Sequence, residues 1–425
     1  MDAILLALND INQTQNQPQI VKEKQSIGLI HQKMQDRYKV VKVLPKEADS
    51  FDNVFNYADA YGKIRFGYFS SKLKSDSTKD EFASAIGGIL GIKTAEYYGV
   101  SLNTAAYISQ DVPLYDEDKQ STDFYTTDGK SYTYLAEASI NYYNDFLEAK
   151  IGRIAIDMPY ANTDDLRMSQ NTFEGGWANI ELPANFSSSL FYLQRWAGFD
   201  SQDDELNQNE FKKLVENSRG MIGASLAYRY NKESELSFWY QNIEYMADIY
   251  YGELNGVYDF NDDYHLDYGL QYSHIAEDKN SNVDGDVWGV MAIGHYRDFF
   301  ISGAFNQALV DEDKSITDGF GGGPYFTSLD EWTIAAASEY ASGENVDFYR
   351  GGIGYDATNI YSSFEYAYGL MDIASAKIKE HDLVYTFNKD EKIVAQAVFM
   401  YYKIDGGELD GEKLNRAVIR VDYNF

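Results

Sequence analysis

The sequence lacks cysteine altogether and is poor in basic residues. The absence of cysteine from its 425 residues excludes disulfide scaffolds, thiolate metal sites and cysteine nucleophiles. Only 36 Lys and Arg oppose 67 Asp and Glu, which gives a net charge of −31. A chain this acidic does not neutralise phosphates, so nucleic-acid binding is excluded. No apolar run approaches the roughly eighteen residues that a transmembrane helix needs.

Aromatic residues, in contrast, are abundant. They form 16% of the chain, and 37 Tyr outnumber 24 Phe. Because disordered acidic chains are poor in aromatic residues, this content argues against disorder. Tyrosine favours positions where one end of the side chain is apolar and the other is wet. The length fits two or three soluble domains, or one large barrel.

From about residue 57 onward, apolar residues recur with period two, which is typical of strands with one apolar face. Three segments show this most clearly. Their apolar faces are expected to hold Tyr132, Tyr134, Ala136, Ala138, Ile140 and Tyr142; Ile222, Ala224, Leu226, Tyr228 and Tyr230; and Leu266, Tyr268, Leu270 and Tyr272. Small or polar residues occupy the opposite faces. A polar interior with tyrosine at the strand ends is typical of a transmembrane barrel.

The connections between these strands alternate in length. Short turns are expected at 144–145, 231–233, 261–264, 358–359 and 388–391, and long acidic loops at 110–130, 157–174, 199–218, 309–345 and 405–412. Short turns on one rim and long loops on the other predict an all-β outer-membrane barrel with periplasmic turns and extracellular loops. The alternative, a soluble lectin-like or repeat β protein, gives no reason for this segregation.

The last segment, residues 413–425, strengthens the prediction of a barrel. Apolar and polar residues alternate along it up to the aromatic residue that ends the chain. Tyr423 and the terminal Phe425 resemble the C-terminal assembly signal of outer-membrane proteins, which the barrel-assembly machinery recognises. Nineteen strand candidates can be counted, but a bacterial barrel has an even number of strands. Counting inward from both ends assigns the candidate at 332–340 to a long loop. Eighteen strands remain, enough to enclose an aqueous channel.

The first 50 residues differ from the rest in being rich in Gln, Lys and Asn. Their apolar patch at 4–8 is too short for a signal-peptide core, so we expect a mature form or one whose leader was removed. Helical spacing predicts a helix over 26–37. Two parts are therefore predicted: a polar periplasmic extension over 1–50, partly helical, and a barrel domain over 51–425.

Three motifs resemble the OprD-type outer-membrane porins. They are KIGRIAIDMPYANTDDLRMSQNTFEGG at 150–176, GGGPYFTSLDE at 321–331 and ADSFDNVF at 48–55. The first resembles the third loop of that family, the second its seventh loop and the last its mature start. The resemblance implies an eighteen-stranded monomer or homotrimer in the bacterial outer membrane. It also implies that loops 3 and 7 fold into the lumen and that basic side chains line the wall.

The candidate constriction residues follow from strand phase and loop position. The cationic candidates on strands are Lys63, Arg65, Arg153, Arg229, Arg350, Arg416 and Arg420. The loop candidates are Asp164, Asp165, Arg167 and Glu174 in loop 3, with Asp330 and Glu331 in loop 7. Opposed charges across a narrow bore orient dipolar or charged solutes. The plain alternative is that each arginine pairs with a carboxylate for structural reasons, and Arg167 in particular would pin loop 3.

These features predict a porin for passive diffusion of small hydrophilic or charged solutes and ions, with a mild cation preference and no cofactor. Loop acids at 116–118, 203–205 and 311–313 form either a solvated rim or weak divalent-cation sites that bridge to lipopolysaccharide. One alternative is a channel specific for carboxylate or amino-acid solutes. A plugged transporter is another, but 1–50 is too short for that plug.

A barrel enzyme is the last alternative. His265 and His381 are expected near periplasmic turns and His295 near a strand end, which leaves His274 to face outward. Its neighbours Ser273 and Glu277 do not make a convincing catalytic group.

Overall fold

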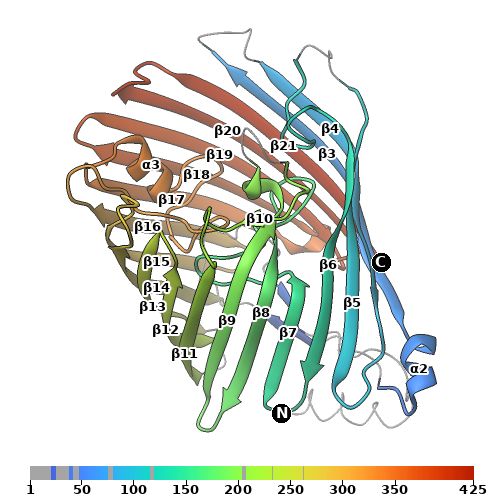
Figure 1. The fold of residues 1–425 in the computed structure, drawn as a ribbon. Helices are drawn as coiled ribbons and strands as arrows, with labels where there is room; N and C mark the ends of the chain where they lie inside the picture. Colours follow the sequence, from blue (N-terminus) through green and yellow to red (C-terminus); the bar gives the residue numbers. More distant parts are fainter. Residues whose placement is uncertain are drawn as a thin grey trace.

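The computed structural model describes residues 21–24, 38–41, 47–74, 80–114, 119–202, 207–231, 233–261 and 263–425. Its main feature is a closed antiparallel β-barrel (Figure 1). A separate two-stranded sheet pairs β1 (Val21–Lys24) with β2 (Tyr38–Val41), and α2 (Phe51–Asn56) precedes the barrel. The helix predicted over 26–37 lies outside the described residues. Among the described residues, no helix is both long and apolar enough to cross a membrane.

Eighteen strands close the barrel, as the parity argument predicted. They are β3 (Asp59–Leu73), β4 (Glu81–Lys93), β5 (Val100–Asp111), β6 (Tyr132–Tyr143), β7 (Leu147–Ile154), β8 (Thr172–Leu182), β9 (Phe186–Ala197), β11 (Met221–Asn231), β12 (Ser234–Ile243), β13 (Ala247–Asn261), β14 (Tyr264–Glu277), β15 (Gly285–Tyr296), β16 (Phe299–Leu309), β17 (Val346–Ala357), β18 (Ser362–Ile373), β19 (Ala376–Lys389), β20 (Ile393–Gly406) and β21 (Lys413–Asn424). A two-residue strand, β10 (Lys212–Lys213), pairs with β9.

The segment at 332–340 does belong to a loop. It forms α3 (Ile334–Tyr340), which begins at Thr333, whose hydroxyl accepts a hydrogen bond from the backbone N–H of Ala336 at 3.0 Å. Single-turn 3₁₀ helices, η5 (Phe199–Ser201) and η6 (Thr358–Ile360), lie in two other connections. The connection after β7, residues 155–171, is called loop 3 below, and the connection after β16, residues 310–345, is called loop 7.

Outward and inward faces alternate along most strands as predicted. On β11 the side chains of Ile222 and Leu226 are exposed, whereas Ser225 between them is buried. On β14 Leu270 and Tyr272 are exposed, whereas Asp267, Gln271 and Ser273 are buried. The barrel therefore presents an apolar, tyrosine-rich outer wall and a polar inner wall.

The predicted apolar, outward-facing side of residues 132–142 is wrong for the first part of this segment. The pairing of β5 with β6 shifts register between Ala105 and Ala106, where Ala136 is the extra residue of a β-bulge. Tyr132, which was expected to share a face with Ile140, is only 4% exposed, while Leu135 and Ile140 are 48% and 52% exposed. The bulge therefore exchanges the two faces, so period-two counting fails across it.

The closing seam between β21 and β3 fixes the position of several charged residues. Asp422 lies directly opposite Arg65, and Asn424 lies opposite Lys63. At the end of the seam the terminal Phe425 exchanges two backbone hydrogen bonds with Gly62, each 3.0 Å. Residues 357 positions apart in the sequence are thus neighbours on the inner wall.

Candidate functional site

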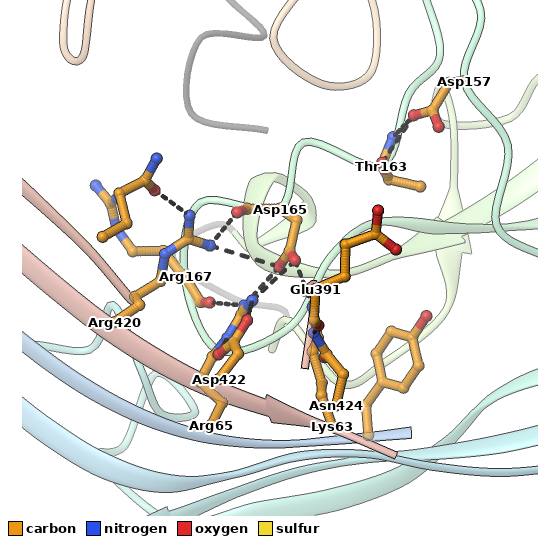
Figure 2. Close-up of polar contacts among 12 residues, drawn as sticks. Lys63, Arg65, Asp157, Thr163, Asp165, Arg167, Glu391, Arg420, Asp422 and Asn424 are labelled. Atoms are coloured by element: carbon orange, nitrogen blue, oxygen red, sulfur yellow. Dashed lines mark hydrogen bonds and ion pairs between the residues drawn. The ribbon is translucent and has the colours of Figure 1, made fainter. Parts of the chain in front are cut away.

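Loop 3 is fastened to the inner wall by one carboxylate, that of Asp165 (Figure 2). The Lys63 ammonium lies 2.5 Å from Asp165 Oδ2. The Arg65 guanidinium donates to both oxygens of Asp165, at 2.5 and 2.9 Å, and to both oxygens of Asp422, at 2.6 and 2.7 Å. It also donates to the carbonyl of Arg167 at 2.5 Å. Arg65 is 2% exposed, and its bidentate pairs use the fork geometry that lysine lacks.

Two further arginines complete this loop 3 anchor. Arg420 on β21 donates to the backbone carbonyl of Asp165, and its other terminal nitrogen donates to Gln396 at 2.5 Å. Arg167 on the loop itself turns away from Asp165. Its Nε donates to Asp123 at 2.9 Å, and its guanidinium packs over the rings of Phe69 and Phe199. Arg167 therefore joins loop 3 to the connection between β5 and β6.

Loop 7 is held by carboxylates on the wall instead. Glu380 on β19 accepts the backbone N–H groups of Glu331 and Trp332 at 2.9 and 3.0 Å, and Asp382 accepts that of Asp330 at 3.1 Å. Arg416 on β21 pairs with the side chains of Glu331 and Asp330, the latter at 3.6 Å. Because β21 carries both Arg416 and Arg420, one strand contacts both loops.

The two loops also contact each other. Backbone hydrogen bonds run from Phe320 to Tyr160 at 2.9 Å and from Asn162 to Phe320 at 3.1 Å. The Tyr160 hydroxyl lies 3.1 Å from that of Tyr325 and 2.6 Å from Ser273 on β14. These contacts place loops 3 and 7 side by side against the inner wall and bury the tyrosines of both.

The loop carboxylates have different affinities for protons. Burial alone would raise the pKa of Asp165, but the charges of Arg65 and Lys63 hold it well below its usual range. Burial raises the pKa of Asp164 well above the usual range, and the neighbouring Asp200 raises it further. Burial likewise raises the pKa of Asp318 in loop 7 to about 7, although the Thr333 hydroxyl donates to it at 2.5 Å. Asp165 therefore stays charged, whereas Asp164 favours the protonated form.

The remaining predicted residues lie elsewhere on the wall. Arg153 pairs with Glu174 at 2.9 Å, where β7 pairs with β8. The prediction that Glu174 lies in loop 3 is wrong, because β8 begins at Thr172 and includes it. Arg350 pairs with Glu365 at 2.7 Å, where β17 pairs with β18. Arg229 lies 3.5 Å from Glu235, two residues before β11 ends, so it belongs to the short-turn rim. The structure thus brings Lys63, Arg65 and Arg420 together on Asp165, and Arg416 onto Asp330 and Glu331. The ion pairs of Arg153, Arg350 and Arg229 lie elsewhere on the wall.

The histidine placements argue against a catalytic group at the outer rim. His274 faces outward and contacts Asp286 at 2.9 Å, whereas Ser273 is buried on the opposite face of β14. The expectation that His381 lies near a periplasmic turn is wrong, because it sits in the middle of β19 against Tyr366.

The comparisons with known proteins decide the family. A sequence model of the outer membrane porin, OprD family, matches residues 88–326, which is more than half of the chain. The chain belongs to the OprD family of outer-membrane porins. It therefore lies in the bacterial outer membrane and passes small solutes, and it is not an enzyme.

Solved porins of Gram-negative bacteria have the same fold. The Pseudomonas aeruginosa porin OccK9 (OpdG) aligns with a TM-score of 0.74 at 12% identity, covering 88% of this chain and 100% of the other. P. aeruginosa OpdK, in a structure with vanillate, gives 0.70 at 14% identity, with 88% and 99% covered. Acinetobacter baumannii OccAB4 gives 0.67 at 15% identity, with 87% and 98% covered. The comparison with curated proteins gives no match.

Sequence reasoning missed four carboxylates of this OprD-family porin. Asp422 lies two residues after Arg420, so the two side chains share one face of β21. That position could have predicted that Asp422 faces the lumen. Glu380 and Asp382 share a phase too, but their partners are backbone N–H groups, which no side-chain pattern reveals. Asp318 was hidden among many loop acids, and its burial follows only from the packing of loop 7.

Replacing Asp165 by Asn is expected to loosen loop 3, because Lys63 and Arg65 would lose a charged partner. Breaking such a buried pair costs about 3 kcal/mol. Single-channel recordings of Asp165→Asn should show a noisier open current and a reversal potential shifted toward anions. The matched control is Asp128→Asn, which removes an exposed ion pair with Lys130. Equal behaviour of the two variants would contradict the anchor.

Asp318 is expected to make the packing of loop 7 depend on pH. Its pKa in the folded protein, about 7, lies above the ordinary 3.8, so the folded state holds the proton more tightly. The resulting stabilisation is full below about pH 4 and is lost as the pH rises through 7. Asp318→Asn should raise the thermal midpoint by a few degrees at pH 8 and leave it unchanged at pH 4. The exposed Asp313→Asn serves as control, and a midpoint of Asp318→Asn equal to wild type at pH 8 would refute the assignment.

Proposed function

We propose that this porin admits small hydrophilic solutes and ions by passive diffusion through a constriction formed by loops 3 and 7, with a mild preference for cations. One observation supports this most directly. Each cationic side chain predicted to line the bore has a carboxylate oxygen within 4.0 Å. The pairs join Lys63, Arg65 and Arg420 to Asp165, and Arg153 to Glu174, Arg167 to Asp123, Arg229 to Glu235, Arg350 to Glu365 and Arg416 to Glu331.

This pairing bears on selectivity because a channel filters charged solutes through the field of its lining. An arginine already bound to Asp165 or Asp422 attracts an anion less than an unpaired one would. Near loop 7, the carboxylates Asp330 and Glu331 share the charge of Arg416, and Glu380 and Asp382 accept backbone N–H groups beside them. Together with the net charge of −31, these acids raise the concentration of cations at the bore.

A channel specific for amino-acid or carboxylate solutes is the second candidate. OpdK, a porin of the same fold, has been solved with the carboxylate vanillate. In the present chain a cationic cluster on β3 and β21 lies near an acidic cluster on β19 and loop 7. Such a pair of clusters suits a zwitterion, whereas a simple carboxylate would have to compete with Asp165 for Arg65. Liposome swelling with amino acids, dicarboxylates and sugars separates these solute classes.

We further propose that the C-terminal strand is the assembly signal. Tyr423 and Phe425 are 43% and 50% exposed on the outer wall, where the assembly machinery has access to them. The outer loops face lipopolysaccharide, and the porin works as a monomer or homotrimer. Residues 1–50 are proposed to form a periplasmic extension. The acids at 116–118 and 203–205 fall outside the described residues, while those at 311–313 are exposed on loop 7.

The reversal potential in a salt gradient across a planar bilayer tests the cation preference. Wild type is expected to pass K⁺ over Cl⁻ by about two- to fivefold, in keeping with an acidic lining. A variant with Asp311 and Asp313 changed to Asn removes rim charge only, so it should keep most of this preference. A reversal potential on the anion side for wild type would reject the proposal.

A further inference from the structure

Two histidines and an aspartate meet on the inner wall at the short-turn end of the barrel, away from the loop 3 anchor. His265, the second residue of β14, lies directly opposite His295, one residue before the end of β15. Asp267, two residues along β14, shares the inner face, and its Oδ2 lies 2.7 Å from His295 Nε2. One ligand atom from each residue lies within 4.8 Å of the other two. We propose that these three side chains form a binding site for a divalent transition-metal ion of the zinc class.

The ligand set matches that chemistry. Two imidazole nitrogens and one carboxylate oxygen are the donors that zinc accepts in sites with an open fourth position. With metal–ligand bonds of about 2.0–2.2 Å, ligand atoms in a tetrahedral site lie about 3.3 Å apart. The His295–Asp267 contact would open slightly and His265 would move inward. Both changes need only small side-chain rotations on a rigid pair of strands.

The two imidazole rings are stacked on adjacent strands. Their ring centroids lie 4.1 Å apart with the planes 14° from parallel. Imidazole binds a metal ion through the lone pair of a ring nitrogen, so the two rings offer two such donors on one face of the wall.

The surroundings of the site favour coordination of a metal ion over a hydrated His295–Asp267 pair. Asp267 is 1% exposed and His295 7% exposed, so both ligands are largely shielded from water. Next to His295 an apolar cluster contains Met291, Ile293 and Phe300, together with Phe326 from loop 7. Such a shell lowers the local dielectric and strengthens metal–ligand bonds.

A cation would reach the site from the side opposite this apolar cluster. His265 is half-buried, and its neighbour on β13 is Asp259, which is exposed. Asp259, His265, His295 and Phe300 form one row across four adjacent strands. The row runs from a carboxylate open to water to an aromatic ring, so a hydrated cation would approach from the Asp259 side. The site lies on the lumenal wall near the periplasmic turns and does not depend on the ion preference proposed above.

Zinc binding to the purified, untagged, full-length porin in detergent tests the proposal. After removal of metal with a chelator, equilibrium dialysis should find one Zn²⁺ bound per chain at micromolar free Zn²⁺. His265→Gln and Asp267→Asn should each weaken this binding at least tenfold. His274→Gln is the matched control, because His274 also contacts an aspartate, Asp286, but on the outer wall and without a second histidine.

Folding of each variant is checked by its heat-modifiable migration on a gel, and Asp267→Asn keeps a hydrogen-bond partner for His295. A zinc absorption-edge spectrum supplies a second measurement, with two imidazole ligands expected. The proposal fails if wild type binds no Zn²⁺ at 100-fold higher concentration. It also fails if the folded His265→Gln variant binds as wild type does, or if His274→Gln removes the binding.

Discussion

The bidentate contacts of Arg65 with Asp165 and Asp422 are the interaction on which the interior of this porin depends. Barrel closure brings Arg65 and Asp422 together, since β3 and β21 meet only when the sheet closes. The guanidinium then has a free side for Asp165, which draws loop 3 onto the wall. Folding of the barrel and placement of the loop are therefore linked through one buried side chain.

The arrangement of loop 7 follows from the same wall. β21 contributes Arg420 to the loop 3 anchor and Arg416 to loop 7, and β19 adds Glu380 and Asp382. Both loops are thus held by charged groups on neighbouring strands: loop 3 by β3 and β21, and loop 7 by β19 and β21. The basic side chains of these strands are used to fix the two loops.

Barrel, strand number and loop 7 assignment could be predicted from the sequence because they depend on period-two patterning and on parity. The local failure at 132–142 came from the bulge at Ala136, which adds a residue without any sequence signal. Lys63, Arg65 and Asp165 could be proposed from strand phase and loop position. Their convergence could not, because it depends on closing contacts between residues 100 or more positions apart. Glu380 and Asp382 bind backbone groups, so their role follows only from the folded structure.

Hydrogen exchange of the loop 3 amides in a double-mutant cycle tests the account most directly. The four proteins are wild type, Arg65→Met, Asp165→Asn and the double variant. If Arg65 holds the loop through Asp165, the opening free energies will be strongly non-additive, with a coupling above about 1 kcal/mol. Once Arg65 is gone, losing Asp165 should then cost less, because only Lys63 and Arg420 of the anchor remain to pair with it. Additive effects within about 0.5 kcal/mol would show that the two residues act independently and would contradict the account.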